Sequence, residues 1–398
     1  MAAPILYLTH RVPHPPNRGD RIRNWHLLQF LAHRHPVWLA CLADEPVPTE
    51  SDDILRKLCS RVEIVPVHMT RWFHGAFSLV RGQSISEGVF QSTRLRRVVE
   101  GWCGEVRFRA AVVSASSLVP YLELPELRHT PKIVDLVDVD SQKWLDYAAT
   151  MKPPRSWLFA LEGRRLRKVE SRLPYWVDAV LLVSAAETDL YRSFALPGPG
   201  RIETVTNGVD LNYFQPQAVE VEPACTFVGA LDYPPNVDAA VWFATTVWPG
   251  LHSSRPELRF RLVGRAPVAE VQALAARPGV EVIGSVPDVR PWIARSSVIV
   301  VPLRIARGLQ NKVLEALAMA KACVASPAAL AGVKARPEAE LLAASGPEQW
   351  QAAIIRLLDD PERRRSLGLA GRQYVETHHS WEACLRPVQE ILSSVKVV

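Results

Sequence analysis

Short apolar runs alternate with longer amphipathic segments along nearly the whole chain. This alternation is typical of βαβ units, in which successive strands lie parallel in one sheet and the helices between them cover its faces. The pattern therefore predicts an α/β protein with mostly parallel sheets. The expected strands form two sets, the first at residues 5–8, 37–42, 62–67, 111–114, 133–137 and 180–183, the second at residues 202–205, 225–228, 258–263, 280–283, 298–301 and 322–325.

The densest turn signal in the chain, Pro197-Gly198-Pro199-Gly200, separates the two sets. A chain of 398 residues is long enough for two domains with separate cores. We therefore expect two Rossmann-like domains, residues 1–199 and 200–379, with a hinge near residue 200. Residues 380–398 form a further amphipathic segment, interrupted by Pro387, which could cross back to the first domain.

Composition narrows the functional class. The first apolar run is too short for a signal peptide, and none approaches the roughly 18 to 20 residues of a membrane span, so we expect a cytoplasmic protein. The six cysteines never form a C-x-x-C pair, which disfavours metal or redox roles. A net charge of +6 is compatible with phosphate-bearing ligands, anionic lipid or nucleic acid, but no nucleic-acid-binding motif is present. Both G-x-G-x-x-G and the P-loop pattern are also missing, which disfavours nicotinamide redox chemistry and ATP hydrolysis.

Residues 300–332 contain the pattern most informative about function: an apolar strand, a loop with Gly308, and a helix expected over residues 310–320. Lys312 and Glu315 are three positions apart and share one face of that helix. A glycine before a helix N-terminus favours anion binding, and Lys312 adds a cation. Glu315 can accept hydrogen bonds from two sugar hydroxyls. The segment predicts a nucleoside-diphosphate site, because ligands in doubly wound folds bind at such strand ends. The alternative is a solvated ion pair on the helix surface.

Two polar clusters follow strands of the first domain. Arg18, Gly19 and Asp20 lie in a proline-rich loop that we expect to face a cleft, although Asp20 could equally be a helix N-cap. Asp138 and Asp140 form an Asp-x-Asp pair, which can hold a divalent cation in some glycosyltransferases. We favour a metal-free, cleft-lining role for Asp138 and helix capping for Asp140.

Residues 155–172 are basic and amphipathic. We expect a helix with its apolar side chains in the core and its basic side in solvent. The alternative is a surface that rests on anionic lipid, for which residues 71–82 are the other candidate.

Several motifs together resemble the retaining glycosyltransferases of the two-lobed GT-B fold, specifically glycosyltransferase family four. They are VTNGVDLNYF (205–214), FVGALDYPPNVDA (227–239), LVGRAP (262–267), VIGSVPDVRPWIARSSVIVVPLR (282–304) and GLQNKVLEALAMA (308–320). In the first half, HRVPHPPNRGDRIRNW (10–25) and VDLVDVDSQKW (134–144) are similar to bacterial exopolysaccharide sugar transferases associated with exosortase systems.

The resemblance implies transfer of a sugar from a nucleotide-diphosphate sugar to a hydroxyl of a glycan or lipid-linked acceptor, with retention and without a metal or another cofactor. Contact with an anionic membrane at the inner face is compatible with it, whereas a nucleic-acid partner is not expected. Catalytic roles would fall to Lys312, Glu315 and Asp138. Donor binding would involve Gly229, Ser285, Val286, Arg304, Gly308, Leu309, Gln310 and Asn311.

Two positions depart from the family pattern. Arg307 stands where family members often carry a second glutamate, and residues 114–121, SASSLVPY, lack the common histidine. Two alternatives therefore remain open: a non-catalytic GT-B scaffold and a sugar-nucleotide epimerase.

Overall fold

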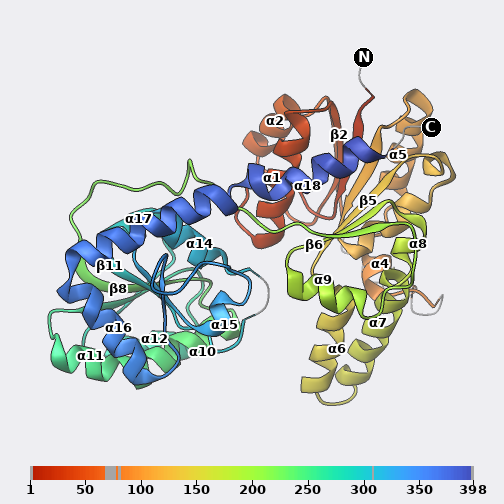
Figure 1. The fold of residues 1–398 in the computed structure, drawn as a ribbon. Coiled ribbons are helices and arrows are strands. Elements are labelled where there is room, and N and C mark those ends of the chain that lie inside the picture. The colour runs from red at the N-terminus through yellow and green to blue at the C-terminus, as the bar shows by residue number, and fades with distance from the viewer. Residues whose placement is uncertain (1–2, 68–77, 79–81, 307–308, 396–398) are drawn as a thin grey trace. The chain divides into compact units, whose positions relative to one another are not determined.

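The computed structural model describes residues 3–67, 78, 82–306 and 309–395. The chain divides into two compact units (Figure 1). The first contains the chain up to Val205 together with the segment from Leu385 onward, and the second contains Thr206–Cys384. Each unit has one sheet of parallel strands with helices packed on it, so the predicted α/β class is confirmed.

The first unit is built on a seven-stranded sheet in the order β3-β2-β1-β4-β5-β6-β7. All neighbouring pairs are parallel. The strands are β1 (Ile5–Thr9), β2 (Val37–Ala43), β3 (Arg61–Pro66), β4 (Ala110–Ser114), β5 (Lys132–Val137), β6 (Ala179–Leu182) and β7 (Arg201–Thr204). Its helices include α1 (Gly19–Ala32), α2 (Thr49–Leu58), α4 (Ile85–Phe90), α5 (Thr93–Glu105), α6 (Asp140–Thr150), α7 (Arg155–Glu170), α8 (Leu173–Trp176) and α9 (Ala185–Arg192), with 3-10 turns at Ser116–Glu123 and Pro125–Leu127.

Strand β7 corrects one prediction. The sequence pattern assigned this run to the second set, but β7 pairs with β6 and completes the first sheet. The glycine-proline turn before it packs on its own unit: the Gly200 amide donates to the Pro174 carbonyl at 2.8 Å, and a Cβ on Gly198 would lie 2.1 Å from the same oxygen. These glycines therefore serve a close approach of two chain segments, and the chain passes to the second unit only after β7.

The second unit is built on a six-stranded sheet in the order β10-β9-β8-β11-β12-β13. Its strands are β8 (Glu222–Val228), β9 (Arg259–Val263), β10 (Val280–Gly284), β11 (Ser296–Val301), β12 (Cys323–Ala325) and β13 (Leu342–Ala343). The sequence pattern missed β13, which has only two residues. The helices include α10 (Pro234–Trp242), α11 (Trp248–Ser254), α12 (Ala269–Gln272), α13 (Arg290–Arg295), α14 (Asn311–Ala318), α15 (Pro327–Leu330), α16 (Pro347–Asp359) and α17 (Pro361–His378).

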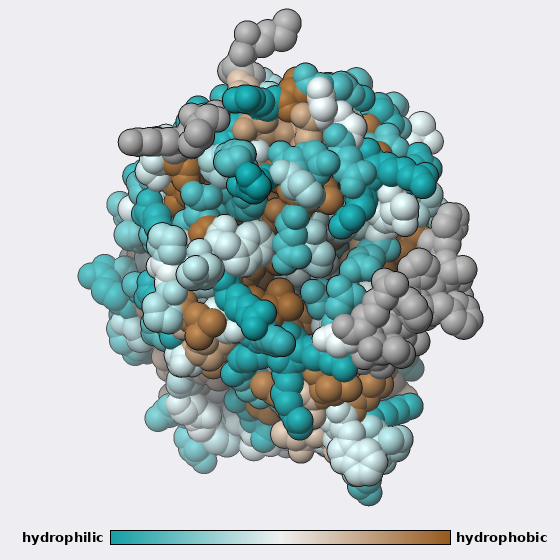
Figure 2. Space-filling model, turned by 90° about the vertical axis from the view of Figure 1, so that its right-hand side faces the viewer, coloured by the Kyte–Doolittle hydropathy of each residue, from teal (hydrophilic) through white to brown (hydrophobic). Residues whose placement is uncertain are grey.

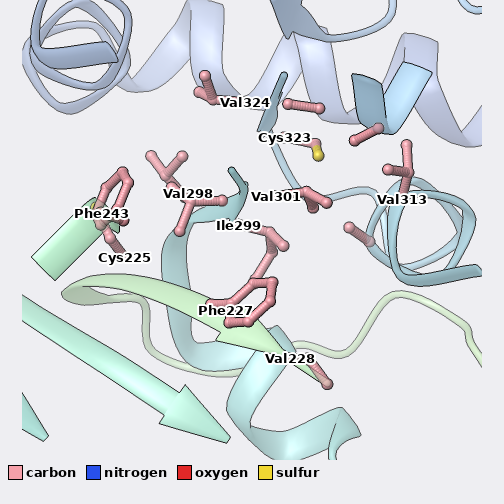
Figure 3. Packing of buried hydrophobic residues seen from close by; sticks show 14 of the residues in the cluster. Cys225, Phe227, Val228, Phe243, Val298, Ile299, Val301, Val313, Cys323 and Val324 are labelled. Carbon is pink, nitrogen blue, oxygen red and sulfur yellow. The ribbon is translucent and has the colours of Figure 1, made fainter. Parts of the chain in front are cut away.

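The core of the second unit holds α14 against the sheet. Figure 3 shows side chains of β8, β11, β12 and α14 gathered in one apolar cluster. Val313, Leu314 and Leu317 of α14 are fully buried in it. This packing fixes the rotation of the helix, whereas Lys312 and Glu315, on the remaining face, stay half-buried.

The last helix, α18 (Trp381–Ser394), is continuous and contains Pro387, which the sequence pattern had suggested as an interruption. Its residues up to Cys384 group with the second unit, and those from Leu385 group with the first. There the Arg109 guanidinium donates to the Leu392 carbonyl at 2.9 Å. Among the described residues, no helix combines the length and the apolar character needed to cross a bilayer.

Candidate functional site

The strand order of the second sheet reverses between β8 and β11. From β8 the chain proceeds through β9 and β10 to one edge, and from β11 it proceeds through β12 and β13 to the other. Loops that leave two such neighbouring strands diverge, and in α/β sheets this switch point is where ligands bind. The loop after β8 leads into α10, and the loop after β11 leads into α14. The Lys312/Glu315 helix is therefore placed at the switch point.

Lys312 is held in place by Asn236 of α10. The Lys312 ammonium donates a 2.5 Å hydrogen bond to the Asn236 side-chain oxygen and lies 5.0 Å from the centre of the Phe227 ring. The Asn236 side-chain NH₂ donates in turn to the Ala230 carbonyl at 2.9 Å. Since Asn236 is only 5% exposed, its conformation is fixed. Asn236 thus positions the ammonium over the carboxyl end of β8, a role that sequence analysis missed although the residue lies in one of the family motifs.

Glycines let the backbone of neighbouring strands come close beneath this ammonium. A Cβ on Gly229, at the end of β8, would lie 2.8 Å from the Asn236 side-chain nitrogen and 3.2 Å from Lys312 Nζ. Gly264, at the end of β9, has φ +156°, and a Cβ there would lie 1.7 Å from the Gly229 carbonyl oxygen. Side chains at these positions would displace the Lys312 support, so the motif glycines have a steric explanation.

Burial shifts both charged groups of α14 toward neutrality. It lowers the pKa of Lys312 to about 8, against the opposing influence of Glu315. It also raises the pKa of Glu315 to about 7, opposed by Lys312. At neutral pH this places a largely protonated ammonium beside a carboxyl that is close to half-ionised, at a partly dry site. This environment differs from that of an ion pair fully surrounded by water. Because burial disfavours the charged ammonium, an anion near Nζ would stabilise it.

Comparison with known proteins identifies the family. The family model for glycosyl transferases group 1 matches residues 222–360, which include β8 to β13 and α14. The alpha-maltose-1-phosphate synthase of Mycolicibacterium smegmatis is 30% identical over 287 residues, which make up 62% of this chain and 72% of that protein. The chain belongs to the group 1 glycosyl transferases. The predicted glycosyltransferase resemblance is thus confirmed at this level, whereas membership of family four and the exosortase association stay predictions.

Solved structures of glycosyltransferases share the transferase's fold. The sucrose-phosphate synthase of Thermosynechococcus elongatus superposes with a TM-score of 0.67 at 16% identity and covers 98% of both chains. Anabaena HepE, solved in complex with UDP and glucose, gives a TM-score of 0.70 at 14% identity over 99% of this chain and 100% of that one. At these identities the likeness establishes fold alone. It confirms the predicted GT-B fold.

Arg304 of the transferase, a predicted phosphate ligand, is already paired. Its guanidinium forms a two-point ion pair with the Asp238 carboxylate of α10, and its side chain is half exposed. An exposed pair of this kind contributes little to stability, about 0 to 1 kcal/mol. Arg304 can therefore exchange Asp238 for another anion at small cost.

The remaining predicted donor residues follow the carboxyl ends of strands in the same sheet. Ser285, which follows β10, is exposed, and Val286 is half-buried against the core. Leu309, Gln310 and Asn311 are half-buried at the start of α14, where the N-cap side chain makes no capping hydrogen bond. The predicted donor residue Gly308 lies outside the described residues, as does Arg307, which departs from the family pattern.

In the first unit, the loop before α1 is organised by ion pairs. Arg18 is the N-cap residue and pairs with Glu45 at 2.9 Å, so the suggestion that Asp20 caps this helix was wrong. Burial disfavours the charged form of Asp20, but hydrogen bonds from His10 and Arg11 outweigh it and lower its pKa. Gly19 has open space where a Cβ would lie, so the geometry gives no steric reason for glycine there.

Asp138 follows β5 at a strained part of the backbone. The β-branched Val137 has φ +68°, and Ala115, at the end of the neighbouring β4, has φ +84°. Such conformations are costly outside glycine and concentrate at functional sites. The Asp138 side chain is open to solvent, yet the protein atoms around it reduce its hydration, and Glu187 and Asp140 repel it, so its pKa is raised to about 6.

The prediction that Asp140 caps the next helix is wrong. Val139 is the N-cap residue of α6, and the Asp140 carboxylate instead accepts a 2.7 Å hydrogen bond from the Ser116 hydroxyl. This contact ties the loop after β4 to the loop after β5. Among the described residues, no group of three or more His, Cys, Asp or Glu side chains is arranged to hold a metal ion.

One buried ion pair between the motif segments 10–25 and 134–144 has a structural role. The Arg23 guanidinium donates two 2.8 Å hydrogen bonds to the Asp135 carboxylate, and both residues are almost completely buried. Arg23 also donates to the Val205 carbonyl at 2.7 Å. It therefore joins α1, β5 and the end of the segment that follows β7.

Proposed function

We propose that the protein transfers a sugar from a nucleoside-diphosphate donor to an acceptor hydroxyl with retention of anomeric configuration. The observation that carries this proposal is the Lys312 ammonium, held by Asn236 above Gly229 at the switch point of the second sheet. Glu315 lies one turn further along the same helix face. Lys312 and the start of α14 bind the diphosphate, and Glu315 accepts hydrogen bonds from the ribose hydroxyls.

Ligands reported for similar structures support a nucleoside diphosphate. HepE has been solved with UDP-glucose, and a TarM variant has been solved with UDP, Fondaparinux and alpha-GlcNAc-glycerol. UDP is accordingly the first ligand to test. In the proposed complex Ser285 and Val286 flank the nucleobase, the backbone of residues 309–311 contacts the phosphates, and Arg304 leaves Asp238 to join them.

The proposed chemistry rests on stabilising the leaving group. Negative charge grows on the diphosphate as the glycosidic bond breaks, and a preorganised cation at that place lowers the barrier. Lys312, with a pKa of about 8, keeps its proton at neutral pH. Front-face attack by the acceptor then gives retention without a protein nucleophile. Because the ammonium and the helix N-terminus supply the positive charge, we propose that turnover is independent of metal and continues in EDTA.

Asp138 is our candidate for the acceptor side of the reaction. Its carboxylate is accessible and ionised above about pH 6, so it can accept a hydrogen bond from the incoming hydroxyl. The acceptor we propose is a glycan or a lipid-linked sugar in exopolysaccharide or cell-surface glycan synthesis, as the resemblance of residues 10–25 and 134–144 implies. The cytoplasmic location stays a prediction.

A direct test measures release of UDP, GDP or ADP from nucleotide sugars in the presence of an acceptor, with the anomeric configuration of the product read by NMR. We expect retention in the product, and loss of turnover in Lys312→Ala and Glu315→Ala. Full activity in both variants would refute the proposal. Epimerised nucleotide sugar formed without acceptor would indicate the epimerase, and binding without turnover of any donor would indicate the scaffold.

Asp138→Asn separates the acceptor side from the donor side. We expect slower transfer with unchanged UDP affinity, and loss of the acid limb near pH 6 in the rate profile. A variant that transfers at the wild-type rate across this pH range would exclude the role proposed for Asp138.

A further inference from the structure

Helices α6 and α7 form a hairpin that projects from the first sheet (Figure 1). Aromatic rings join the two helices, because Trp144 of α6 packs on Phe159 of α7 with ring centres 5.1 Å apart. The middle of α7 is tied to α4, since the buried Glu162 carboxylate accepts hydrogen bonds from the Ile85 and Ser86 amides at 2.6 and 2.9 Å. The hairpin is therefore a braced element whose orientation on its unit is fixed.

The outer part of this hairpin is unexpectedly apolar at its surface. We had expected the apolar side chains of residues 155–172 to be in the core, and Leu166 is indeed fully buried. The first half of α7 differs, because Trp157 is 71% exposed. Other exposed apolar side chains of the hairpin are Tyr147, Met151, Leu158 and Leu161. The expectation of a core-facing helix was thus wrong for the half nearest the connecting loop.

The face of α7 that carries Trp157 also carries positively charged side chains, nearer the body of the unit. Trp157, Leu161, Arg164 and Lys168 follow one another at helical spacings of four, three and four residues, so they form one outward stripe. All four are exposed. The apolar pair lies nearer the hairpin tip and the cationic pair nearer the base.

Acidic groups of α7 do not oppose this charge. Its two glutamates, Glu162 and Glu170, point inward and are buried. Glu162 accepts the two amides of α4, and Glu170 accepts the Ser141 amide at 3.1 Å. Lys152 and Arg155, both exposed, add two cations at the tip. In Figure 1 the hairpin lies at the lower right, and Figure 2 views the molecule from that right-hand side. The lower part of Figure 2 shows hydrophobic and hydrophilic residues intermixed at the surface.

We propose that the tip of the α6–α7 hairpin docks on an anionic lipid bilayer. An exposed tryptophan and leucine with exposed cations on both sides along the helix match a segment that lies at a membrane surface. There the apolar side chains enter the acyl boundary and the long cationic side chains contact the anionic headgroups. A folded protein partner would not require cations on both sides of the apolar pair. The inference is independent of the donor chemistry and adds to the proposed function that the enzyme works at the lipid surface, where a lipid-linked acceptor resides.

The test is co-sedimentation of the full chain with vesicles of phosphatidylcholine alone or with one third phosphatidylglycerol. We expect binding to the anionic vesicles only, weakened by 0.5 M NaCl (about a 4 Å screening length). Trp157→Ser/Leu161→Ser should weaken binding about tenfold or more, and Arg164→Glu/Lys168→Glu about thirtyfold or more. The matched control is Arg365→Glu/Leu369→Ser, which changes an exposed arginine and an exposed leucine one turn apart on α17 and should bind like wild type.

Each variant is also measured for thermal stability and UDP affinity, which should equal those of wild type if only docking is lost. Absence of wild-type binding to anionic vesicles would overturn the proposal, as would equal weakening by the α17 control. A dimer in solution that Trp157→Ser/Leu161→Ser dissociates would show that a second copy covers the tip instead. If the wild-type protein bound anionic vesicles but showed no sugar transfer, the result would count against the proposed function and leave the docking proposal standing.

Discussion

Replacing Lys312 by methionine should separate nucleotide binding from stability. Burial lowers the pKa of Lys312 from 10.5 to about 8, and each pKa unit corresponds to about 1.4 kcal/mol. Keeping this side chain protonated at neutral pH therefore costs the folded state about 3 kcal/mol, a cost that Lys312→Met removes. The substitution also leaves the buried Asn236 oxygen without its donor, which costs about 1 to 3 kcal/mol. The two effects should cancel to within about 2 kcal/mol.

Nucleotide affinity should respond much more strongly. A hydrogen bond to a charged group is worth about 1.5 to 3 kcal/mol, so Lys312→Met should bind UDP about 10- to 150-fold more weakly. Calorimetry measures the affinity, and urea unfolding measures the stability. The pH dependence has a definite sign: because the pKa is lower in the folded protein, the cost is present below about pH 8 and disappears above about 10.5. Wild type should therefore gain stability relative to Lys312→Met across that interval.

Lys321→Met is the matched control for this prediction. Lys321 lies just before β12, and burial also lowers its pKa to about 8. Its ammonium donates a hydrogen bond to the Ala294 carbonyl at 2.8 Å. The stability change should be similar, but UDP affinity should stay at the wild-type value. If Lys312→Met bound UDP within threefold of wild type, or if both variants lost affinity equally, the placement of the diphosphate at Lys312 would be refuted.

Substitutions at Glu315, Gly264 and Arg23 test other features of the structure. Glu315→Gln should remove most of the roughly tenfold preference for UDP over its 2′,3′-dideoxy analogue. Since the pKa of Glu315 is about 7, calorimetry should show this preference falling from pH 8 to 6 in wild type and staying constant in the variant. Gly264→Ala should destabilise by about 3 kcal/mol or more in urea unfolding, because its Cβ would overlap the backbone of the loop after β8. Gly104→Ala, with open space in α5, should instead stabilise by about 0.5 to 1 kcal/mol. Arg23→Met should cost about 3 to 5 kcal/mol by leaving a buried carboxylate unpaired, and Arg23→Met/Asp135→Leu should recover most of it.

Opposite results have clear meanings. A pH-independent preference for the ribose hydroxyls would place their acceptor elsewhere than Glu315. A stable Gly264→Ala protein would mean that the loop after β8 can move, and the Lys312 support with it. If the Arg23/Asp135 double variant were as unstable as the single one, packing and the contact to the Val205 carbonyl would outweigh the ion pair.

Much of the fold could be predicted from the sequence because its signals are local. Every apolar run that was expected to be a strand contributes to a strand, since a buried parallel strand needs only a few consecutive apolar residues between turns. The helix expected at residues 310–320 is α14, because the spacing of Val313, Leu314 and Leu317 fixes its buried face. Lys312 and Glu315 could be placed on the other face for the same reason.

Only the tertiary structure decided which distant segments meet. The partner of β7, the pairing of Arg23 with Asp135, and the contact of Lys312 with Asn236, which is 76 residues away, all depend on strand order. Exposure of Trp157 was likewise beyond the sequence, because amphipathic spacing states which side chains share a face but not whether another element covers it. Local periodicity acts within one helix or strand, whereas strand pairing and burial arise from contacts between segments far apart in the chain.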